Sequence, residues 1–350
     1  MLSKKKLSEI KSHLEKAQNP IFFFDNDQDG LCSFLLLQRA FGRGKGVAIK
    51  SFPDLNESYF RKVEELNADY IFVLDKPVIS DSFLERVKEK NIPFVWIDHH
   101  DVEVQKLDFI NYYNPFFDDE NTNEPVTAIC YEISKRKEDI WLGVVGCIAD
   151  GFLPYFYRDF AREYPELSFE SDKAFDVLYK ARIGEVARIF GAGLKDTTSN
   201  VVAMIKFLIK SRGPYDALEE NSQNHSFHKR YKQVRERYGR ILEKAVPLAK
   251  SSEDLVFFKY SGDISISGEL SNELCYLFPK KKIAVAYIKG GKVNLSLRGK
   301  GIRNIFVDAI NGFDGASGGG HRDAVGGQLQ EKDLEDFRKK LEFFVSNEYK

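Results

Sequence analysis

The chain has 350 residues, with 52 basic and 53 acidic side chains, and 43% of its residues are hydrophobic. Single hydrophobic cores stop growing beyond roughly 250–300 residues, so this length predicts two domains, and the hydrophobic content excludes a disordered or fibrous protein. The net charge of −1 excludes binding of polyanions over the whole surface, so any contact with nucleic acid requires a local basic patch.

No segment has the pattern of a membrane span or a secretory signal. The longest apolar runs, at 21–24 and 35–37, are far shorter than the roughly 18 residues that a membrane helix needs. Residues 1–16 are rich in Lys and Glu and contain no apolar signal core. The four cysteines lie far apart, without a C-x-x-C spacing, as expected of reduced thiols. We therefore expect a cytoplasmic protein without a membrane partner.

The first 150 residues alternate between two kinds of pattern. Short apolar runs predict buried strands at 21–24, 47–52, 70–74 and 93–97. Helical periodicity predicts helices at 31–41, 57–66, 81–90, 126–135 and 140–148. Because strands and helices alternate, we expect βαβ units and a mostly parallel sheet with flanking helices.

The second half of the sequence changes character twice. From about 168 to 249 the pattern is almost purely helical, and it ends in a basic stretch at 225–244. Strands are then predicted at 256–260, 283–287 and 293–297, helices near 269–278, 304–310 and 332–346, and a glycine-dense loop at 312–327. The predicted fold class is α/β: an N-terminal domain with a mostly parallel sheet, a helical connector and a smaller C-terminal α/β domain.

An acidic segment follows the first predicted strand directly. It contains Asp25, Asp27 and Asp29 in the pattern D-x-D-x-D-G. The same spacing begins a calcium-binding helix-loop-helix, but position 12 of that loop should be Glu and is Leu36 here, and the preceding segment is strand-like. A polar turn with Gly30 at a positive φ angle is the remaining alternative to a functional site.

Two further strands end in the same way. Asp75 follows the strand at 70–74, and Asp98, His99 and His100 follow the strand at 93–97. A single Asp after a strand is usually a helix cap, but ligands bind at the carboxyl ends of parallel strands, so we expect these groups in one cleft. Gathered carboxylates repel one another unless a cation binds. Carboxylates with an imidazole and no thiolate suit Mn²⁺ or Mg²⁺ better than structural zinc.

These segments resemble the motifs of the DHH phosphoesterase superfamily. The resemblance lies in D-x-D-x-D-G at 25–30, Asp75, D-H-H at 98–100 and G-C-I-A-D at 146–150. G-G-G-H at 318–321, followed by Ala324 and two glycines at 326–327, resembles the signature of the DHH-associated domain. The three-Asp first motif and the Ile-Ala-Asp fourth motif are most similar to RecJ-type single-strand exonucleases. At this length there is no room for an extra oligonucleotide-binding domain, so the chain is most similar to the short archaeal members.

The resemblance implies a domain organisation and an activity. It implies a DHH catalytic domain at 1–215, a helical connector at 216–250 and a DHH-associated substrate-binding domain at 251–350. It implies an exonuclease that hydrolyses single-stranded DNA or RNA and releases 5′-mononucleotides with two Mn²⁺ or Mg²⁺ ions. The alternatives are a phosphodiesterase of short oligonucleotides, cyclic dinucleotides or nucleotide bisphosphates, and a replication or repair scaffold without catalysis. A helicase or replisome component and a second copy of the chain are the protein partners it suggests; polarity stays open.

The resemblance also implies roles for individual residues. The metal ligands are Asp25, Asp27, Asp29, Asp75, His99 and Asp150. Asp25 and Asp27 would hold one ion and Asp29 the second. Asp75 would bridge both ions, and His99 and Asp150 would complete the second site. His100 would face the scissile phosphate as a proton donor or relay, and Asp98 would orient a histidine.

The C-terminal half supplies candidates for substrate binding. Glycines let a backbone approach a phosphate closely, although most glycine runs are flexible loops. Arg298 supplies a planar fork for phosphate oxygens. The resemblance therefore assigns substrate binding to Arg298, Gly318, Gly319, Gly320 and His321.

The connector has a basic face and an apolar stripe. Its basic side chains either track a phosphate backbone or form a solvated face. The spacing of the apolar residues favours packing over base stacking; they are Phe227, Tyr231, Val234, Tyr238 and Ile241.

Overall fold

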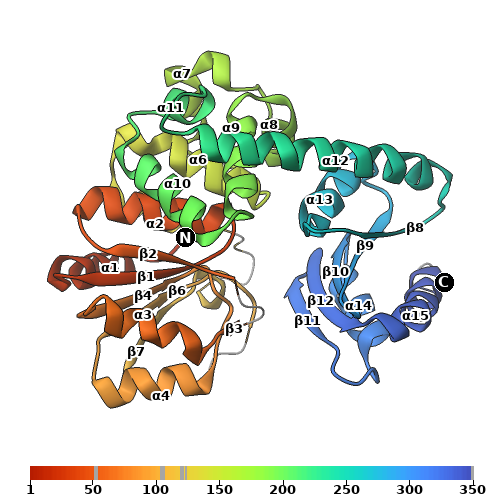
Figure 1. Cartoon of the computed structure of the whole chain (residues 1–350), viewed down its shortest axis with the longest axis horizontal. Coiled ribbons are helices and arrows are strands. Elements are labelled where there is room, and N and C mark those ends of the chain that lie inside the picture. Colours follow the sequence, from red (N-terminus) through yellow and green to blue (C-terminus); the bar gives the residue numbers. More distant parts are fainter. Residues whose placement is uncertain (51–53, 103–106, 119–121, 123, 348–350) are drawn as a thin grey trace. The chain divides into compact units, whose positions relative to one another are not determined.

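The chain forms two compact units, shown in Figure 1. The computed structural model describes residues 1–50, 54–102, 107–118, 122 and 124–347. The units are Met1–Tyr231 and Lys232–Lys350. Both contain a β-sheet covered by helices, which confirms the predicted α/β class with a parallel N-terminal sheet and a smaller C-terminal domain.

The first unit contains a five-stranded parallel sheet in the order β2-β1-β4-β6-β7. Its strands are β1 (Pro20–Asp25), β2 (Lys45–Ile49), β4 (Tyr70–Leu74), β6 (Phe94–Ile97) and β7 (Ile110–Tyr113). β3 (Asp54–Leu55) and β5 (Val78–Ile79) form a separate pair. The central strands are apolar, apart from Asp25 at the end of β1, because helices cover both faces. The last residues of the strand predicted at 47–52 lie outside the described residues.

Six helices belong to this sheet or lie beside it. They are α1 (Lys4–Lys16), α2 (Gln28–Phe41), α3 (Phe60–Glu65), α4 (Asp81–Lys90), α5 (Val126–Ser134) and α6 (Ile140–Ala149). α3 and α4 cover one face, where Val63 and Phe83 join a core with Phe23 of β1. α2 covers the other face, where Phe34 stacks on Phe24 at a ring-centroid distance of 5.3 Å.

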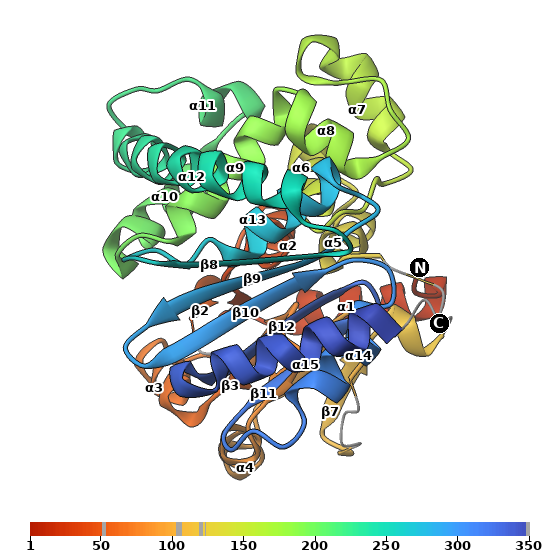
Figure 2. The same ribbon diagram turned by 90° about the vertical axis from the view of Figure 1, so that its right-hand side faces the viewer.

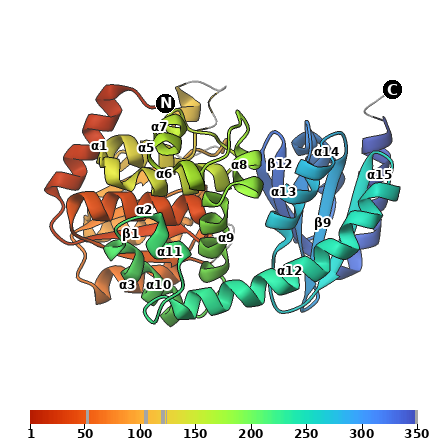
Figure 3. The same cartoon turned by 90° about the horizontal axis from the view of Figure 1, so that it is seen from above.

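A run of helices follows, as predicted. They are α7 (Tyr157–Glu163), α8 (Ala174–Lys180), α9 (Ile183–Leu194), α10 (Thr198–Lys210), α11 (Pro214–Leu218) and α12 (His225–Ser251). Figure 3 shows α12 as one continuous helix. Phe227, Tyr231 and Val234 of its apolar stripe are buried, and Tyr238 and Ile241 pack on a core cluster. The stripe is therefore packing, as predicted. Within the described ranges, no helix is long and apolar enough to cross a membrane.

The second unit contains a mixed five-stranded sheet in the order β11-β12-β10-β9-β8, with β8 and β9 parallel. Its strands are β8 (Leu255–Ser261), β9 (Lys282–Lys289), β10 (Lys292–Arg298), β11 (Ser317–His321) and β12 (Ala324–Gln330). α14 (Ile302–Ile310) and α15 (Leu334–Asn347) cover one face (Figure 2), and α13 (Ser267–Leu277) packs on the other with the last turns of α12.

The predicted glycine-dense loop at 312–327 is wrong over most of its length. Residues 317–327 form most of the antiparallel hairpin of β11 and β12. A Cβ atom on Gly318 or Gly327 would lie 2.6 or 2.5 Å from Cζ of Phe306, which is closer than packing permits. These two glycines therefore let the Phe306 ring of α14 lie against the hairpin. The prediction failed because glycine disfavours strands and has no side chain to show their alternation.

Candidate metal centre

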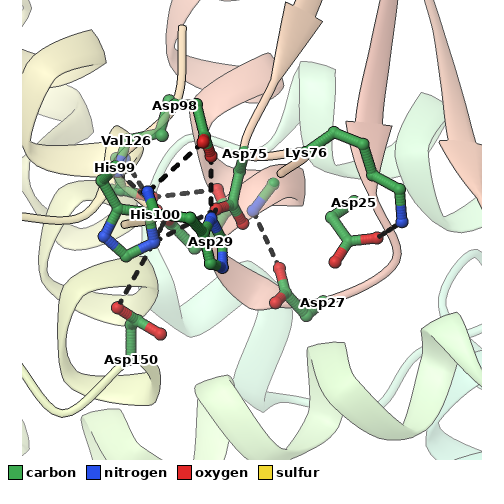
Figure 4. Close-up of polar contacts among 12 residues, drawn as sticks. Asp25, Asp27, Asp29, Asp75, Lys76, Asp98, His99, His100, Val126 and Asp150 are labelled. Atoms are coloured by element: carbon green, nitrogen blue, oxygen red, sulfur yellow. Dashed lines mark hydrogen bonds and ion pairs between the residues drawn. The ribbon is translucent and has the colours of Figure 1, made fainter. Parts of the chain in front are cut away.

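Three neighbouring strands of the parallel sheet end at one edge and deliver the predicted acidic groups there (Figure 4). Asp25 is the last residue of β1, Asp75 follows β4, and Asp98, His99 and His100 follow β6. Phe24 pairs with Leu74 and Leu74 with Ile97, so the strand ends are level. The register of the sheet thus brings together residues that lie up to 75 positions apart.

The first acidic segment turns directly from β1 into α2. Asp27 is the N-cap of α2, and its carboxylate accepts a hydrogen bond from the N–H of Gly30 at 3.0 Å. Gly30 lies inside the helix and has no positive φ angle, so the polar turn considered as an alternative is absent. A Cβ on Gly30 would lie 2.4 Å from the carbonyl oxygen of Asp25. Glycine therefore lets the start of α2 lie close to the end of β1. Burial, followed by repulsion from Asp25 and Asp29, raises the pKa of Asp27 to about 7.

Asp29 is held by the start of a helix from another part of the chain. Its carboxylate accepts hydrogen bonds from the backbone N–H groups of Val126 at 2.9 Å and Thr127 at 2.7 Å, in the first turn of α5. A helix N-terminus stabilises negative charge, yet burial still raises the pKa of Asp29. A Cβ on Gly146 of α6 would lie 2.2 Å from Oγ1 of Thr127. The glycine of the predicted fourth motif therefore allows α6 to pack against α5.

Asp29, Asp75 and His99 form the compact centre of the site. One potential ligand atom from each lies within 4.8 Å of the others, and all three residues are buried. Nε2 of His99 is 3.3 Å from Oδ1 of Asp75 and 3.8 Å from Oδ2 of Asp150, which caps the end of α6. Asp75 has a φ angle of 58°, an uncommon value for a residue other than glycine that often marks a functional site.

The electrostatics of this centre fit a divalent cation. Burial, and then repulsion from Asp29 and Asp27, raises the pKa of Asp75 well above its ordinary value. Burial and the neighbouring His100 lower the pKa of His99 to about 4, so its imidazole is neutral and has a lone pair for a metal. No described residue donates a hydrogen bond to the buried Oδ1 of Asp75. Asp29, Asp75 and His99 could hold an ion, and Asp150 lies beside them.

Asp98 and His100 form a second pair beside the centre. Nδ1 of His100 donates a hydrogen bond to Oδ1 of Asp98 at 2.8 Å, and the hydroxyl of Tyr112 donates to Oδ2 at 3.4 Å. Burial opposes the charge of His100, but the attraction of Asp98 outweighs it and raises the pKa to about 9. Burial likewise raises the pKa of Asp98, but His100 outweighs that effect and the pKa lies below its ordinary value. The pair is an imidazolium held by a carboxylate.

Lys76 is a residue of this edge that sequence reasoning missed. It follows Asp75, is 1% exposed, and places Nζ 2.9 Å from Oδ1 of Asp25. The indole N–H of Trp96 donates a hydrogen bond to the carbonyl oxygen of Lys76 at 2.8 Å, which fixes the backbone there. A lysine directly after a strand-end aspartate was the available signal. The N–H groups of Val126 and Thr127 carried no signal, because backbone donors leave no trace in residue types.

The substrate-binding candidates all lie in the second unit. Arg298, at the end of β10, donates hydrogen bonds to Oδ1 of Asn272 at 2.5 Å and to the carbonyl oxygen of Val325 at 3.2 Å. Ala324 pairs with both Arg298 and His321, so these two residues flank it at one end of the sheet. The other candidates lie on β11, the edge strand: Gly318, Gly319 and Gly320. Gly320 has a φ angle of 142°, which only glycine adopts readily.

Comparisons with known proteins agree with this architecture. Residues 255–347 match the family model of the DHHA1 domain. The crystal structure of RecJ in complex with Mn²⁺ from Thermus thermophilus superposes with a TM-score of 0.70 over 98% of this chain and 54% of that chain, at 15% identity. The chain therefore has a RecJ-like fold. It spans about half the length of the Thermus RecJ chain.

Two further solved structures cover the whole fold. One is exonuclease RecJ bound to manganese, with a TM-score of 0.67 and 16% identity, covering 99% of this chain and 96% of that one. The other is the DHH domain of a member of the s1p family of ribosomal proteins, with a TM-score of 0.66 and 14% identity, covering 98% and 91%. No curated protein matches the chain in sequence. At these identities the likeness is one of fold.

Proposed function

We propose that the chain is a divalent-metal-dependent phosphodiesterase that degrades single-stranded DNA or RNA from one end and releases 5′-mononucleotides. The observation that carries the proposal is the buried group of Asp29, Asp75 and His99, whose carboxylates have raised pKa values and whose imidazole is neutral. Buried like charges destabilise a fold unless a cation or a proton neutralises them. The RecJ-like fold supports a phosphodiester as the substrate, and the manganese-bound RecJ structures support Mn²⁺ as the ion.

The residues of the first unit divide the chemistry between them. A bound Mn²⁺ or Mg²⁺ ion would supply positive charge against the developing charge on the phosphoryl oxygens. Asp29, Asp75 and His99 would hold it, with Asp27 and Asp150 as further proposed ligands. His100 is the proposed proton donor to the leaving oxygen, because Asp98, which accepts a hydrogen bond from Nδ1, raises the pKa of His100 to about 9. Asp98 keeps His100 charged and oriented.

We propose that the second unit binds the substrate. Arg298, His321 and the glycines of β11 are the candidate phosphate contacts, since Arg298 and His321 flank the same residue of β12. Arg298 offers a planar group for phosphate oxygens, and Gly319 leaves open space beside its backbone. The proposed domains are a catalytic domain at 1–215, a connector at 216–250 and a substrate-binding domain at 251–350.

Digestion of end-labelled substrates tests this function. The substrates are 5′- and 3′-labelled single strands of DNA and RNA, with Mn²⁺ or with EDTA, beside a dinucleotide control. The variants are Asp75→Asn, which removes the central carboxylate, and Asp172→Asn, which changes an exposed carboxylate of the same unit. We expect a ladder from one label with wild type and Asp172→Asn, and almost none with EDTA or Asp75→Asn. Cleavage of the dinucleotide alone would favour a short-oligonucleotide phosphodiesterase, and full activity of Asp75→Asn would contradict the proposal.

A further inference from the structure

Lys76 is a buried cation at the edge where the metal ligands converge. Its ammonium lies 2.9 Å from Oδ1 of Asp25, and its side chain is 2% exposed. β1 and β4 are neighbours in the sheet, so a residue just beyond β4 can reach the carboxylate at the end of β1. Figure 4 shows the Lys76 side chain extending to Asp25, away from His99 and Asp150.

The groups that could hold a metal leave Asp25 out. Among the described residues of the first unit, two sets of three ligand atoms are compact enough: Asp29, Asp75 and His99, and Asp75, Asp98 and His100. In the second set, Asp98 and His100 hydrogen-bond to each other. One compact site therefore remains, and the carboxylate predicted to hold the other ion forms an ion pair with a lysine instead.

We propose that Lys76 takes the place of one of the two metal ions, so that the centre binds a single divalent ion at Asp29, Asp75 and His99. The inference rests on the proposed function, because it requires this edge to be a metal centre. A divalent ion at Asp25 would lie beside the ammonium and be repelled by it. If the ion displaced Lys76 from Asp25, the buried ammonium would lose this ion pair, which is strongly unfavourable.

Having Lys76 in place of an ion changes the positive charge that the site provides. Lysine supplies one fixed positive charge where an ion supplies two, and a chelator cannot remove it. Asp25 then acts by holding Lys76 in place, and Lys76 acts as a positioning residue that sets the number of ions. This role differs from the sequence-based expectation that Asp25 and Asp27 hold an ion of their own.

Metal stoichiometry tests the inference without any substrate. Metal-free full-length protein is titrated with Mn²⁺ by calorimetry, and electron paramagnetic resonance shows whether bound ions lie close enough to couple. The variants are Lys76→Met, which keeps much of the volume and removes the charge, and Lys88→Met, an exposed lysine of α4 as the control. We expect one ion in wild type and Lys88→Met, and two in Lys76→Met. Two ions in wild type, or one in both wild type and Lys76→Met, would overturn the inference.

Asp25→Asn gives an independent answer if Lys76→Met does not fold. The inference predicts that this variant binds its single Mn²⁺ ion with an affinity within about twofold of wild type, because Asp25 is not a ligand. Loss of a ligand or of a residue that orients one costs roughly 10–100-fold in metal affinity, so a loss of that size in Asp25→Asn would refute the inference. Wild-type protein that binds no Mn²⁺ at all would instead refute the proposed metal centre itself, which keeps the two failures distinguishable.

Discussion

Asp27→Asn should stabilise the metal-free protein at pH 8. The substitution removes a charge that the fold disfavours, while asparagine keeps the N-cap of α2, since Asn and Asp cap helices equally well. The pKa of Asp27 rises from 3.8 to about 7, and a tenfold change in proton affinity corresponds to about 1.4 kcal/mol. Ionised Asp27 therefore costs at most about 4 kcal/mol, and we expect about 2–3 kcal/mol because the side chain is only half-buried.

The sign of the pH dependence follows from the raised pKa. Below the ordinary value of 3.8, Asp27 is protonated in both folded and unfolded chains and costs nothing. As the pH rises towards 7, the unfolded chain loses this proton first, so the free energy of unfolding falls, and above 7 the cost is constant. The stabilisation by Asp27→Asn should therefore be largest at pH 8 and less than half as large at pH 5.

Thermal denaturation of EDTA-treated protein measures this effect. At about 2–4 °C per kcal/mol for a domain of this size, Asp27→Asn should raise the Tm of the first unit by about 4–12 °C at pH 8. Asp172→Asn, an exposed control, should leave the Tm unchanged. Saturating Mn²⁺ should remove most of the difference, because the ion offsets the repulsion among the carboxylates. An unchanged or lower Tm for metal-free Asp27→Asn at pH 8, or the same gain at both pH values, would refute the electrostatic reasoning.

Variants of the two neighbouring histidines should lose activity for different reasons. His99→Ala should weaken Mn²⁺ binding by roughly 10–100-fold and regain part of its activity in excess Mn²⁺, whereas His100→Ala should lose turnover with an unchanged metal requirement; equal rescue of both contradicts these roles. Gly146→Ala should lower both Tm and Mn²⁺ affinity, because the added Cβ meets Thr127 and displaces the helix start that holds Asp29. A Tm and a calorimetric Mn²⁺ affinity equal to those of wild type would refute this. Arg298→Ala should bind single strands roughly 10–150-fold more weakly by fluorescence anisotropy, the loss of a charge-assisted contact, while Mn²⁺ binding stays as in wild type; unchanged strand affinity would refute its proposed role.

The sequence predicted most of the first sheet because its buried strands are short apolar runs between helical patterns. β7 was missed, since it is an edge strand whose sequence, Ile-Asn-Tyr-Tyr, mixes polar and aromatic residues without a clear alternation. α1 was missed because its charged residues hide a narrow apolar face, in which Ile10 and Leu14 are the buried positions. In both, the burial that stabilises the element depends on contacts with distant segments.

The acidic residues of the site were recognisable because carboxylates at strand ends form a pattern. How they pair was not predictable, because pairing depends on side-chain geometry. Nothing in the sequence shows that Lys76 turns back to Asp25 or that Asp29 accepts the N–H groups of α5. The role of Gly30 was likewise hidden, since only the structure shows that the carbonyl of Asp25 leaves no room for a Cβ.

Anomalous diffraction from crystals grown with Mn²⁺ shows directly whether the carboxyl edge of the parallel sheet is a divalent-metal centre. We predict an anomalous peak within bonding distance of carboxylate oxygens of Asp29 and Asp75 and of Nε2 of His99, and no such peak in crystals of Asp75→Asn. A wild-type map with no anomalous peak among these three residues, at a Mn²⁺ concentration that supports hydrolysis of single strands, would contradict the account.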